Sequence, residues 1–199
     1  LIGVDDMNFD SLANEMIQRR FDPSQIQTKL EMSKTNKTEH MILYHGSNVQ
    51  VSTPKIFVTN RMLDFGAGFY TTSNRQQAVK WAKTQAIRRR KGKPIVSMYD
   101  FDEEKLDGMS VCRFESADKE WLNFVADNRK GKYIGEKYDL VIGPVANDNT
   151  MPVISNYMSG IIDEKTALIL LKPQKLSDQY AFLTEKGISI LRFLGGENV

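Results

Sequence analysis

The chain has 199 residues, 41% of them hydrophobic and 26% charged, which suits one soluble globular domain with an appendage. Its single cysteine excludes an intramolecular disulfide, and one cysteine with two histidines excludes a Cys/His site for structural zinc. No apolar run approaches the roughly 20 residues of a membrane-spanning helix. We therefore expect a cytoplasmic protein with no membrane partner and no metal.

The first forty residues predict a helical hairpin that precedes the main domain. One helix is expected over 9–20 and a second from Asp22, on apolar residues at helical spacing: Leu12, Met16, Ile17, Ile26 and Leu30. A wholly polar stretch, 33–39, follows as a linker. We divide the chain into an appendage, residues 1–40, and a domain, residues 41–199. The hairpin either covers part of the domain or is an adaptor for a partner protein. An antitoxin or a chaperone is a candidate partner of the protein as a whole.

The rest of the chain alternates strand and helix signals without a regular βαβ repeat, which favours an α+β fold over a doubly wound one. Strands are expected at 41–44, at the Phe-Tyr-Thr-Thr segment 69–72, and at 95–101, 140–142, 179–183 and 190–194. Helices are expected from Ser73 to Gly92, around 121–129, at 153–159 and after Asp163 as N-cap.

Two of these elements carry patterns that can be compared with a structure. The helix after Ser73 begins with a capping box at 73–76 and has Ala78, Trp81 and Ala82 along one side. In the strand 179–183 successive side chains point to opposite faces. Gln179, Ala181 and Leu183 are expected on one face, and Tyr180 and Phe182 on the other.

The segment 42–72 combines strand signals with residues suited to binding a small molecule. His45 can donate or accept a hydrogen bond, and it is followed by Gly46, which has no Cβ to keep a ligand away from the backbone. Further along, two glycines precede Phe69 and Tyr70, whose rings offer a surface on which a flat ligand can stack. The segment therefore predicts a ligand contact surface.

Tyr44-His45-Gly46, followed by Gly-Phe-Tyr-Thr-Thr at 68–72, resembles the first two signature motifs of the ADP-ribosyltransferase superfamily, in its diphtheria-toxin-like, His-Tyr-Glu branch. More closely, residues 41 to 193 resemble a bacterial family of uncharacterised domains assigned to that superfamily. The other matching motifs are Glu-Trp-Leu-Asn-Phe at 120–124, Tyr-Asp-Leu-Val-Ile-Gly-Pro at 138–144 and Asp-Gln-Tyr at 178–180.

The resemblance implies a split β-sheet core with flanking helices and an enzyme that uses NAD as co-substrate without a metal. Such an enzyme cleaves NAD and transfers one ADP-ribose to a macromolecular acceptor, protein or nucleic acid, as a bacterial intracellular toxin or effector. The implied catalytic residues are Gln179, His45 and Tyr70. The implied cofactor-binding residues are Tyr44, His45, Gly46, Ser47, Gly68, Phe69 and Tyr70.

The resemblance also implies individual roles. His45 would hydrogen-bond the adenosine-side ribose, the Gly46 backbone would hold the nicotinamide amide, and Tyr70 would stack on the nicotinamide ring. Tyr44 and Phe69 suit a hydrophobic core equally well. Cleavage of the bond between nicotinamide and ribose passes through a cation-like sugar, so positive charge must be stabilised.

Gln179 departs from the family pattern, which has a glutamate at this position. An amide can accept a hydrogen bond from a ribose hydroxyl, but it cannot take a proton and offers less charge to a cationic transition state. The acceptor then needs no general base, or a nearby acid supplies the charge, or the domain binds NAD without turning it over. The candidate acids are Asp178, Glu185, Asp64 and Glu120.

A one-signed charge run occupies residues 75–93, with eight Lys/Arg and no acid. Such a run suits phosphate, which favours a nucleic-acid acceptor or, as a third hypothesis, a phosphate-backbone binder with no nucleotide site. The alternative is structural, since basic residues at 88–91 complement the negative end of a helix dipole.

Overall fold

The elements of the domain are known for residues 40–57 and 62–199, which the computed structural model describes. The predicted hairpin lies outside these residues. The strands are β1 (His40–Ser47), β2 (Phe69–Thr71), β3 (Ile95–Asp102), β4 (Val111–Arg113), β5 (Leu140–Pro144), β6 (Asp178–Phe182) and β7 (Arg192–Asn198). The α-helices are α3 (Arg75–Arg89), α4 (Lys119–Lys130), α5 (Met151–Met158), α6 (Glu164–Leu171) and α7 (Glu185–Ile188). The predicted α+β class is confirmed.

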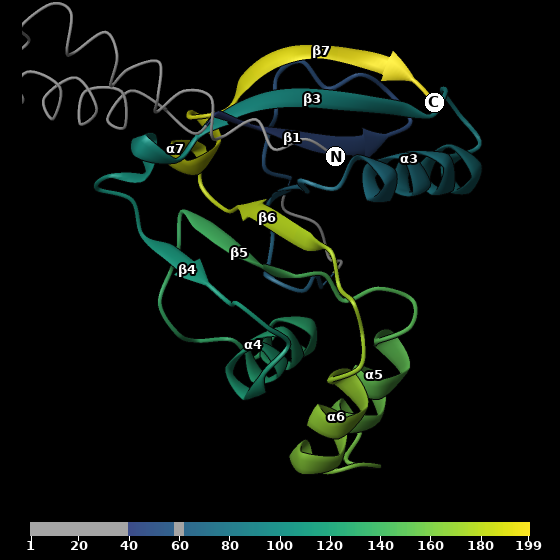
Figure 1. Cartoon of the computed structure of the whole chain (residues 1–199), viewed down its shortest axis with the longest axis vertical. Helices are drawn as coiled ribbons and strands as arrows, with labels where there is room; N and C mark the ends of the chain where they lie inside the picture. The colour runs from purple at the N-terminus through teal and green to yellow at the C-terminus, as the bar shows by residue number, and fades with distance from the viewer. Residues whose placement is uncertain (1–39, 58–61) are drawn as a thin grey trace, which may run out of the picture. The chain divides into compact units, whose positions relative to one another are not determined.

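The strands form two sheets that meet at one point. The first has the order β1-β3-β7 and is antiparallel, while the second has the order β2-β6-β5-β4 and is antiparallel except for the parallel pair of β4 and β5. Between the sheets, Tyr44 and Thr72 exchange backbone hydrogen bonds of 2.8 and 3.0 Å. Figure 1 shows the first sheet above the second, with α4, α5 and α6 below both.

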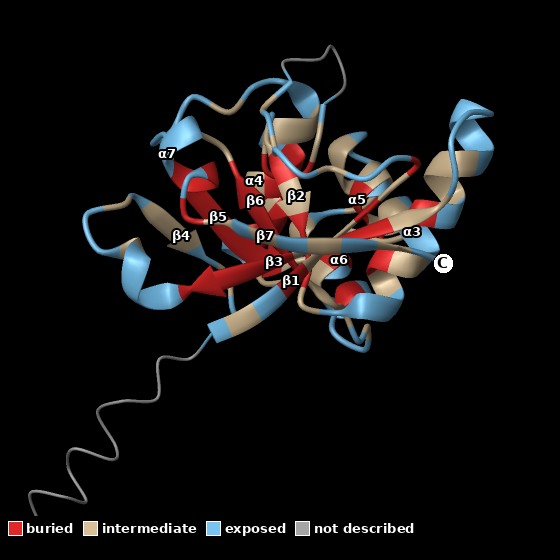
Figure 2. Ribbon diagram, turned by 90° about the horizontal axis from the view of Figure 1, so that it is seen from above, coloured by how far each residue is buried: buried red, intermediate tan, exposed pale blue. Residues whose placement is uncertain are grey.

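Three apolar clusters define the layers. Figure 2 shows buried segments along the strands and in patches on the helices. The first cluster lies between the sheets and includes Leu43, Tyr99 and Phe182. The second joins the other face of the second sheet to α4, α5 and α6, and the third joins α3 to the outer face of the first sheet. The domain is therefore layered as α3, sheet, sheet and three helices.

β1 extends three residues further than the sequence predicts. A strand was expected to stop at Tyr44, but pairing with β3 continues to Ser47. The reason is the missing side chain at Gly46, where a Cβ would lie 2.1 Å from the backbone oxygen of Ala78. Only glycine lets α3 approach the strand this closely, so His45 and Gly46 are held in a strand rather than in a loop.

Helix α3 corrects two details of the sequence reading. Asn74, not Ser73, is the N-cap, because its carboxamide oxygen accepts the backbone N–H groups of Gln76 and Gln77. The capping box does not form. Trp81 does not share the buried side with Ala78 and Ala82 but is 42% exposed, because the small alanines alone fit the close helix-to-strand contact.

The predictions for α6 and β6 are confirmed, whereas the last strand differs from its predicted bounds. Asp163 caps α6 as expected, by accepting the backbone N–H of Thr166 at 2.8 Å. The alternation of β6 is also as predicted, with Ala181 facing the helices and Phe182 facing the first sheet. The last strand begins at Arg192, two residues later than expected, and the sequence reading missed β4 and α7.

Candidate functional site

The edge of β1 at Gly46 offers a backbone donor and a backbone acceptor. Tyr44 exchanges both of its backbone hydrogen bonds with Thr72, so its N–H and C=O point away from β3. By the alternation of an antiparallel pair, the N–H and C=O of Gly46 point to the same side. Within the described parts of the chain these two buried groups have no hydrogen-bond partner. Buried backbone groups are nearly always paired, so this edge is suited to a ligand.

His45 is held in one tautomer beside that edge. Its Nδ1–H donates to the backbone oxygen of Tyr70 at 2.7 Å, and its ring packs on Phe69 with 4.5 Å between centroids. Burial lowers the pKa of His45, which keeps the ring neutral. With Nδ1 protonated, Nε2 carries a lone pair and can accept a hydrogen bond. The arrangement suits a hydroxyl donor.

Tyr70 is fixed by the loop that precedes it. Its hydroxyl donates to the backbone oxygen of Gly66 at 2.6 Å and accepts the backbone N–H of Phe65 at 3.1 Å. Gly66 has φ +94, a left-handed conformation that glycine adopts readily. Burial raises the pKa of Tyr70, and the charge of Asp64 adds to the effect. Tyr70 is therefore a neutral ring whose hydroxyl is anchored to the loop.

Gln179 is part of a buried polar chain that the sequence did not reveal. Its Nε2 donates to Asp64 Oδ2 at 3.3 Å, and Arg129 pairs with Asp64 Oδ1 at 2.5 Å. Gln179 and Asp64 are 5% and 6% exposed. Because a carboxylate oxygen accepts hydrogen bonds, the amide NH₂ of Gln179 faces Asp64. The amide oxygen is turned away from Asp64.

The four candidate acids now have distinct positions. Of the four, Asp64 is the acid whose side chain hydrogen-bonds the side chain of Gln179. Asp178 accepts hydrogen bonds at 2.9 Å from the Thr72 hydroxyl and the Ser73 N–H, and it also accepts the Ser73 hydroxyl, so it joins the end of β2 to the start of β6. Glu120 and Glu185 are exposed residues in the first turns of α4 and α7. Asp64 is the acid that the structure brings to the site.

The remaining residues of the predicted set have mainly structural contacts. Tyr44 packs its ring toward α3, on the face of β1 opposite Leu43, and takes part in the site only through its backbone. Phe69 is a core residue between the sheets. A Cβ at Gly68 would lie 2.7 Å from the Phe182 oxygen, so this glycine allows close packing on β6. Ser47 ends β1 opposite Ile95.

The three predicted catalytic side chains meet at β2 but from two sides. His45 reaches the Tyr70 backbone from the side of Phe69, between the sheets. Tyr70 pairs with Ala181 in the register of β2 and β6, so its ring projects to the helix-covered face, where Gln179 and Asp64 also lie. The structure therefore brings Tyr70 and Gln179 together on one face and places His45 next to them across the strand.

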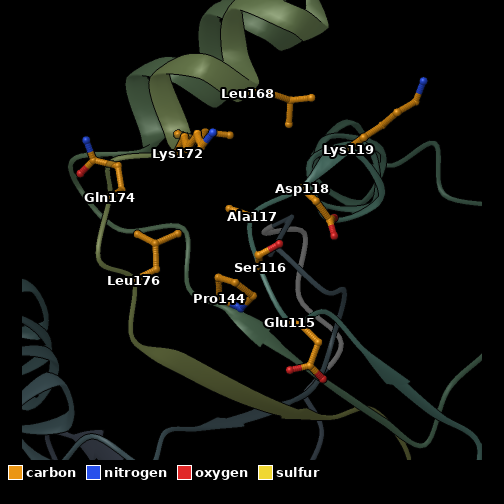
Figure 3. Close-up of a pocket in the computed structure, with 11 residues that line it drawn as sticks. Glu115, Ser116, Ala117, Asp118, Lys119, Pro144, Leu168, Lys172, Gln174 and Leu176 are labelled. Carbon is orange, nitrogen blue, oxygen red and sulfur yellow. The ribbon is translucent and has the colours of Figure 1, made fainter.

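A separate pocket of about 540 Å³ contains none of the predicted site residues. Figure 3 shows it between the start of α4, the end of α6 and Pro144. Two of its charged groups are engaged within the fold, since Asp118 caps α4 and Lys119 pairs with Glu164 at 3.1 Å, while Glu115 and Lys172 also line it. The pocket has an apolar floor of leucines.

The sequence does not reveal the roles of two residues of the site. From sequence alone, Arg129 marks only the end of a helix, and Asp64 is only one of four candidate acids. A signal was present, because Asp64 stands between Leu63 and Phe65, and a charge within an apolar segment needs a partner when it is buried. The partner lies 65 residues away, beyond any local pattern.

No group of three or more His, Cys, Asp or Glu side chains in the described ranges could hold a metal ion. The helices of these ranges are also too short or too polar to cross a membrane.

A search of curated proteins found no match, and a search of solved structures found none. A family model described as "Protein of unknown function (DUF3990)" matches residues 41–193, which is most of the chain. The chain therefore belongs to the DUF3990 family.

Proposed function

We propose that this protein is a mono-ADP-ribosyltransferase that cleaves NAD and transfers ADP-ribose to a macromolecular acceptor. The observation that carries the proposal is the backbone edge at Gly46, which has no partner within residues 40–57 and 62–199, beside His45, whose tautomer is fixed by Tyr70. The sequence motifs at 44–46 and 68–72 support it through their resemblance to the ADP-ribosyltransferase superfamily.

The edge at Gly46 matches the chemistry of nicotinamide. A primary carboxamide has one N–H₂ donor and one C=O acceptor on the same carbon. The C=O and N–H of Gly46 point to one side of β1 and can pair with both in the manner of a strand partner. Because Gly46 has no side chain, α3 can pack directly against the strand without displacing these two backbone groups.

His45 and Gln179 are suited to hydroxyl groups of the sugars. Each offers an acceptor whose direction is set by a neighbour, Nε2 by the bond to Tyr70 and the amide oxygen by the bond to Asp64. A ribose hydroxyl donates readily to either acceptor. Acceptors fixed before the substrate arrives need little reorganisation, which favours binding and catalysis.

The transfer step needs charge stabilisation more than proton transfer from the protein. The nucleophile of the acceptor bonds to C1′ of the nicotinamide-side ribose as the C1′–N bond breaks, and the electron pair leaves with neutral nicotinamide. The proton of the acceptor passes to water. Asp64 places a carboxylate next to Gln179, although Arg129 offsets part of its charge, so an acceptor that is itself a good nucleophile is expected.

Transfer can be tested with the full chain and NAD labelled in its adenylate half. We expect label on a macromolecule from a cell lysate, together with released nicotinamide. Gln179→Ala should remove both signals, whereas the control Gln50→Ala, an exposed glutamine beside Gly196, should leave them unchanged. Neither transfer nor nicotinamide release by the unaltered chain would refute the proposal.

A second candidate is an NAD-binding module without turnover. It is favoured by the neutral Gln179 and by Arg129, which partly neutralises the acid next to it. This candidate predicts binding of NAD in calorimetry with no nicotinamide after prolonged incubation. Gln179→Glu separates the candidates further, because nicotinamide release that appears only in this variant would mean that the amide restrains an otherwise competent site.

A further inference from the structure

The C-terminal half of α3 and the loop after it carry a dense group of exposed cations. We define the basic surface by Lys83, Arg88, Arg89, Arg90, Lys91 and Lys93, all of which are exposed. In the described part of the chain none of the six forms a salt bridge with an acid. Helix-dipole complementation involves only the last turn, Arg88 and Arg89. The other four cations remain to be explained.

The loop that carries these cations is firmly held. Asn48 donates from its side chain to the Lys91 oxygen at 2.9 Å and accepts the Lys93 N–H at 3.0 Å through its backbone oxygen. A Cβ at Gly92 would lie 2.0 Å from that same backbone oxygen. The charges therefore stand on a fixed loop next to the end of β1, where little chain entropy is lost when a ligand binds.

Arg90 occupies a position that normally favours glycine. It is the C-cap of α3 with φ 47, and no other non-glycine residue of the described ranges has a positive φ. A left-handed conformation costs a side-chain-bearing residue on the order of 1 kcal/mol. Stability alone would favour glycine here, so the arginine side chain has a use outside the fold.

An exposed aromatic ring lies along the same helix. Trp81 is 42% exposed, and the Arg88 guanidinium lies 5.6 Å from its ring centroid. Proteins that bind single-stranded nucleic acid combine a cationic surface for phosphates with aromatic rings on which bases stack. Trp81 and the basic surface provide both, over about 15 to 20 Å of helix and loop at 1.5 Å per helical residue.

We infer that Trp81 and the basic surface of α3 form a binding site for single-stranded nucleic acid. The span and the six charges, which have no acidic partner among the described residues, exceed what the two phosphates of one dinucleotide need. A membrane surface is disfavoured, since Trp81 is paired with Arg88 and Ile87 is the other large apolar side chain exposed on α3. The inference goes beyond the proposed NAD chemistry and does not depend on it.

The test measures binding of the full chain, without NAD, to labelled oligonucleotides of about 16 nucleotides by fluorescence anisotropy. RNA and DNA of one sequence are compared with the duplex. We expect single strands of either kind to bind more tightly than the duplex. Removing three phosphate contacts in Arg88→Ala/Arg89→Ala/Arg90→Ala should weaken binding at least tenfold and reduce the slope of log affinity against log salt by about 2.

The matched control removes three exposed lysines on the α6 side of the domain, Lys165→Ala/Lys172→Ala/Lys175→Ala, and should change binding less than twofold. Trp81→Ala should weaken binding about fivefold with the salt slope unchanged, and Trp81→Phe should restore most of the loss, because stacking needs a ring and not a charge.

Equal losses in the two triple variants would overturn the inference, since binding would then follow net charge alone. Duplex binding as tight as single-strand binding, or binding only to vesicles of anionic lipid, would overturn it as well. Failure of all oligonucleotides to bind would overturn the inference but leave the NAD proposal intact, because nicotinamide release is measured separately.

Discussion

His45 makes stability depend on pH in a direction that the structure fixes. Burial lowers the pKa of His45 in the folded protein below its ordinary 6.5. As pH falls through 6.5, the unfolded chain takes up a proton that folded His45 refuses, so the free energy of unfolding decreases until the folded pKa is reached. The contribution of His45 is therefore complete above 6.5 and is lost on acidification.

We expect His45→Asn, which keeps a donor for the Tyr70 oxygen, to flatten this part of the pH profile. Urea unfolding of both proteins, followed from about pH 8 to about pH 5, measures the effect. His40 pairs with Asp100 in both proteins, so the comparison isolates the effect of the residue at position 45. If the free energy of unfolding varied with pH in the same way in both proteins, His45 would not be the source of the pH dependence.

The ion pair of Arg129 and Asp64 predicts a stability difference at the level of single residues. Arg129→Met leaves the nearly buried Asp64 without its cation, which should cost about 2 to 3 kcal/mol in urea unfolding. The control Arg75→Met breaks a pair with Glu197 that is partly exposed on both sides, and it should cost less than about 1 kcal/mol. Equal losses would contradict the special role of the buried pair.

Residue patterns in the sequence identified Gly46, His45, Tyr70 and Gln179 because each stands in a short motif with its neighbours. They did not reveal which acid reaches Gln179. That contact depends on how residues 64 and 179 are brought together, and no local spacing contains this information. The role of Tyr44 was likewise open, and the strand alternation turns its ring away from His45.

At the scale of elements, the contact of β1 with α3 depends on one missing methyl group. Gly46→Ala would place a Cβ 2.1 Å from the Ala78 oxygen and 2.8 Å from the Ala82 nitrogen, both backbone atoms of α3. We expect a loss of about 3 kcal/mol in thermal or urea unfolding, because the helix must move away from the strand.

The control for this change is Gly196→Ala, at a position in β7. There the nearest atoms belong to the Gln50 side chain, at 2.6 to 3.0 Å, and this exposed side chain can rotate away. We expect a loss below about 1 kcal/mol. Similar losses for the two alanines would mean that the helix adapts as easily as a side chain does.

The end of α3 predicts a gain in stability. Arg90→Gly relieves a left-handed arginine and should raise the free energy of unfolding by about 0.5 to 1 kcal/mol. Arg89→Gly, one residue earlier and still helical, should lower it by about 1 kcal/mol. Urea unfolding compares them directly. A loss in both variants would show that the cap conformation is not strained.

Elements with a strong periodic pattern were predicted, and elements without one were not. β3, α4 and the alternation of β6 have clear apolar patterns, and their positions agree with the structure. β4 has three residues and is held by parallel pairing with β5, which lies 29 positions later. Its formation is a consequence of that distant partner and leaves almost no local trace.

At the scale of the whole molecule, NAD binding should stabilise the fold. A ligand that binds only the folded state at a hundred times its Kd adds about 2.7 kcal/mol. For a chain of this size we expect the melting temperature to rise by roughly 5 to 10 °C. His45→Asn should reduce the rise at the same NAD concentration. No shift at saturating NAD would favour a protein with no nucleotide site.

The fold class followed from the order of elements, but the layering did not. A lack of βαβ regularity was enough to expect an α+β domain. Helix α3 covers one sheet, while α4, α5 and α6 cover the other. This arrangement depends on which face of each sheet packs against which helix. Such pairings are settled by packing between distant segments, so composition and local spacing cannot supply them.

The edge of β1 at Gly46, unpaired within the described residues, has a cost for the protein when no ligand is present. Backbone groups that can hold a carboxamide can also hold a strand from another molecule, and unpaired strand edges are where misassociation begins. Here the edge is short, because the bridge of Tyr44 with Thr72 already uses its centre. Concentrated solutions should therefore remain monodisperse longer when nicotinamide is added, since the small amide competes with a second chain for Gly46.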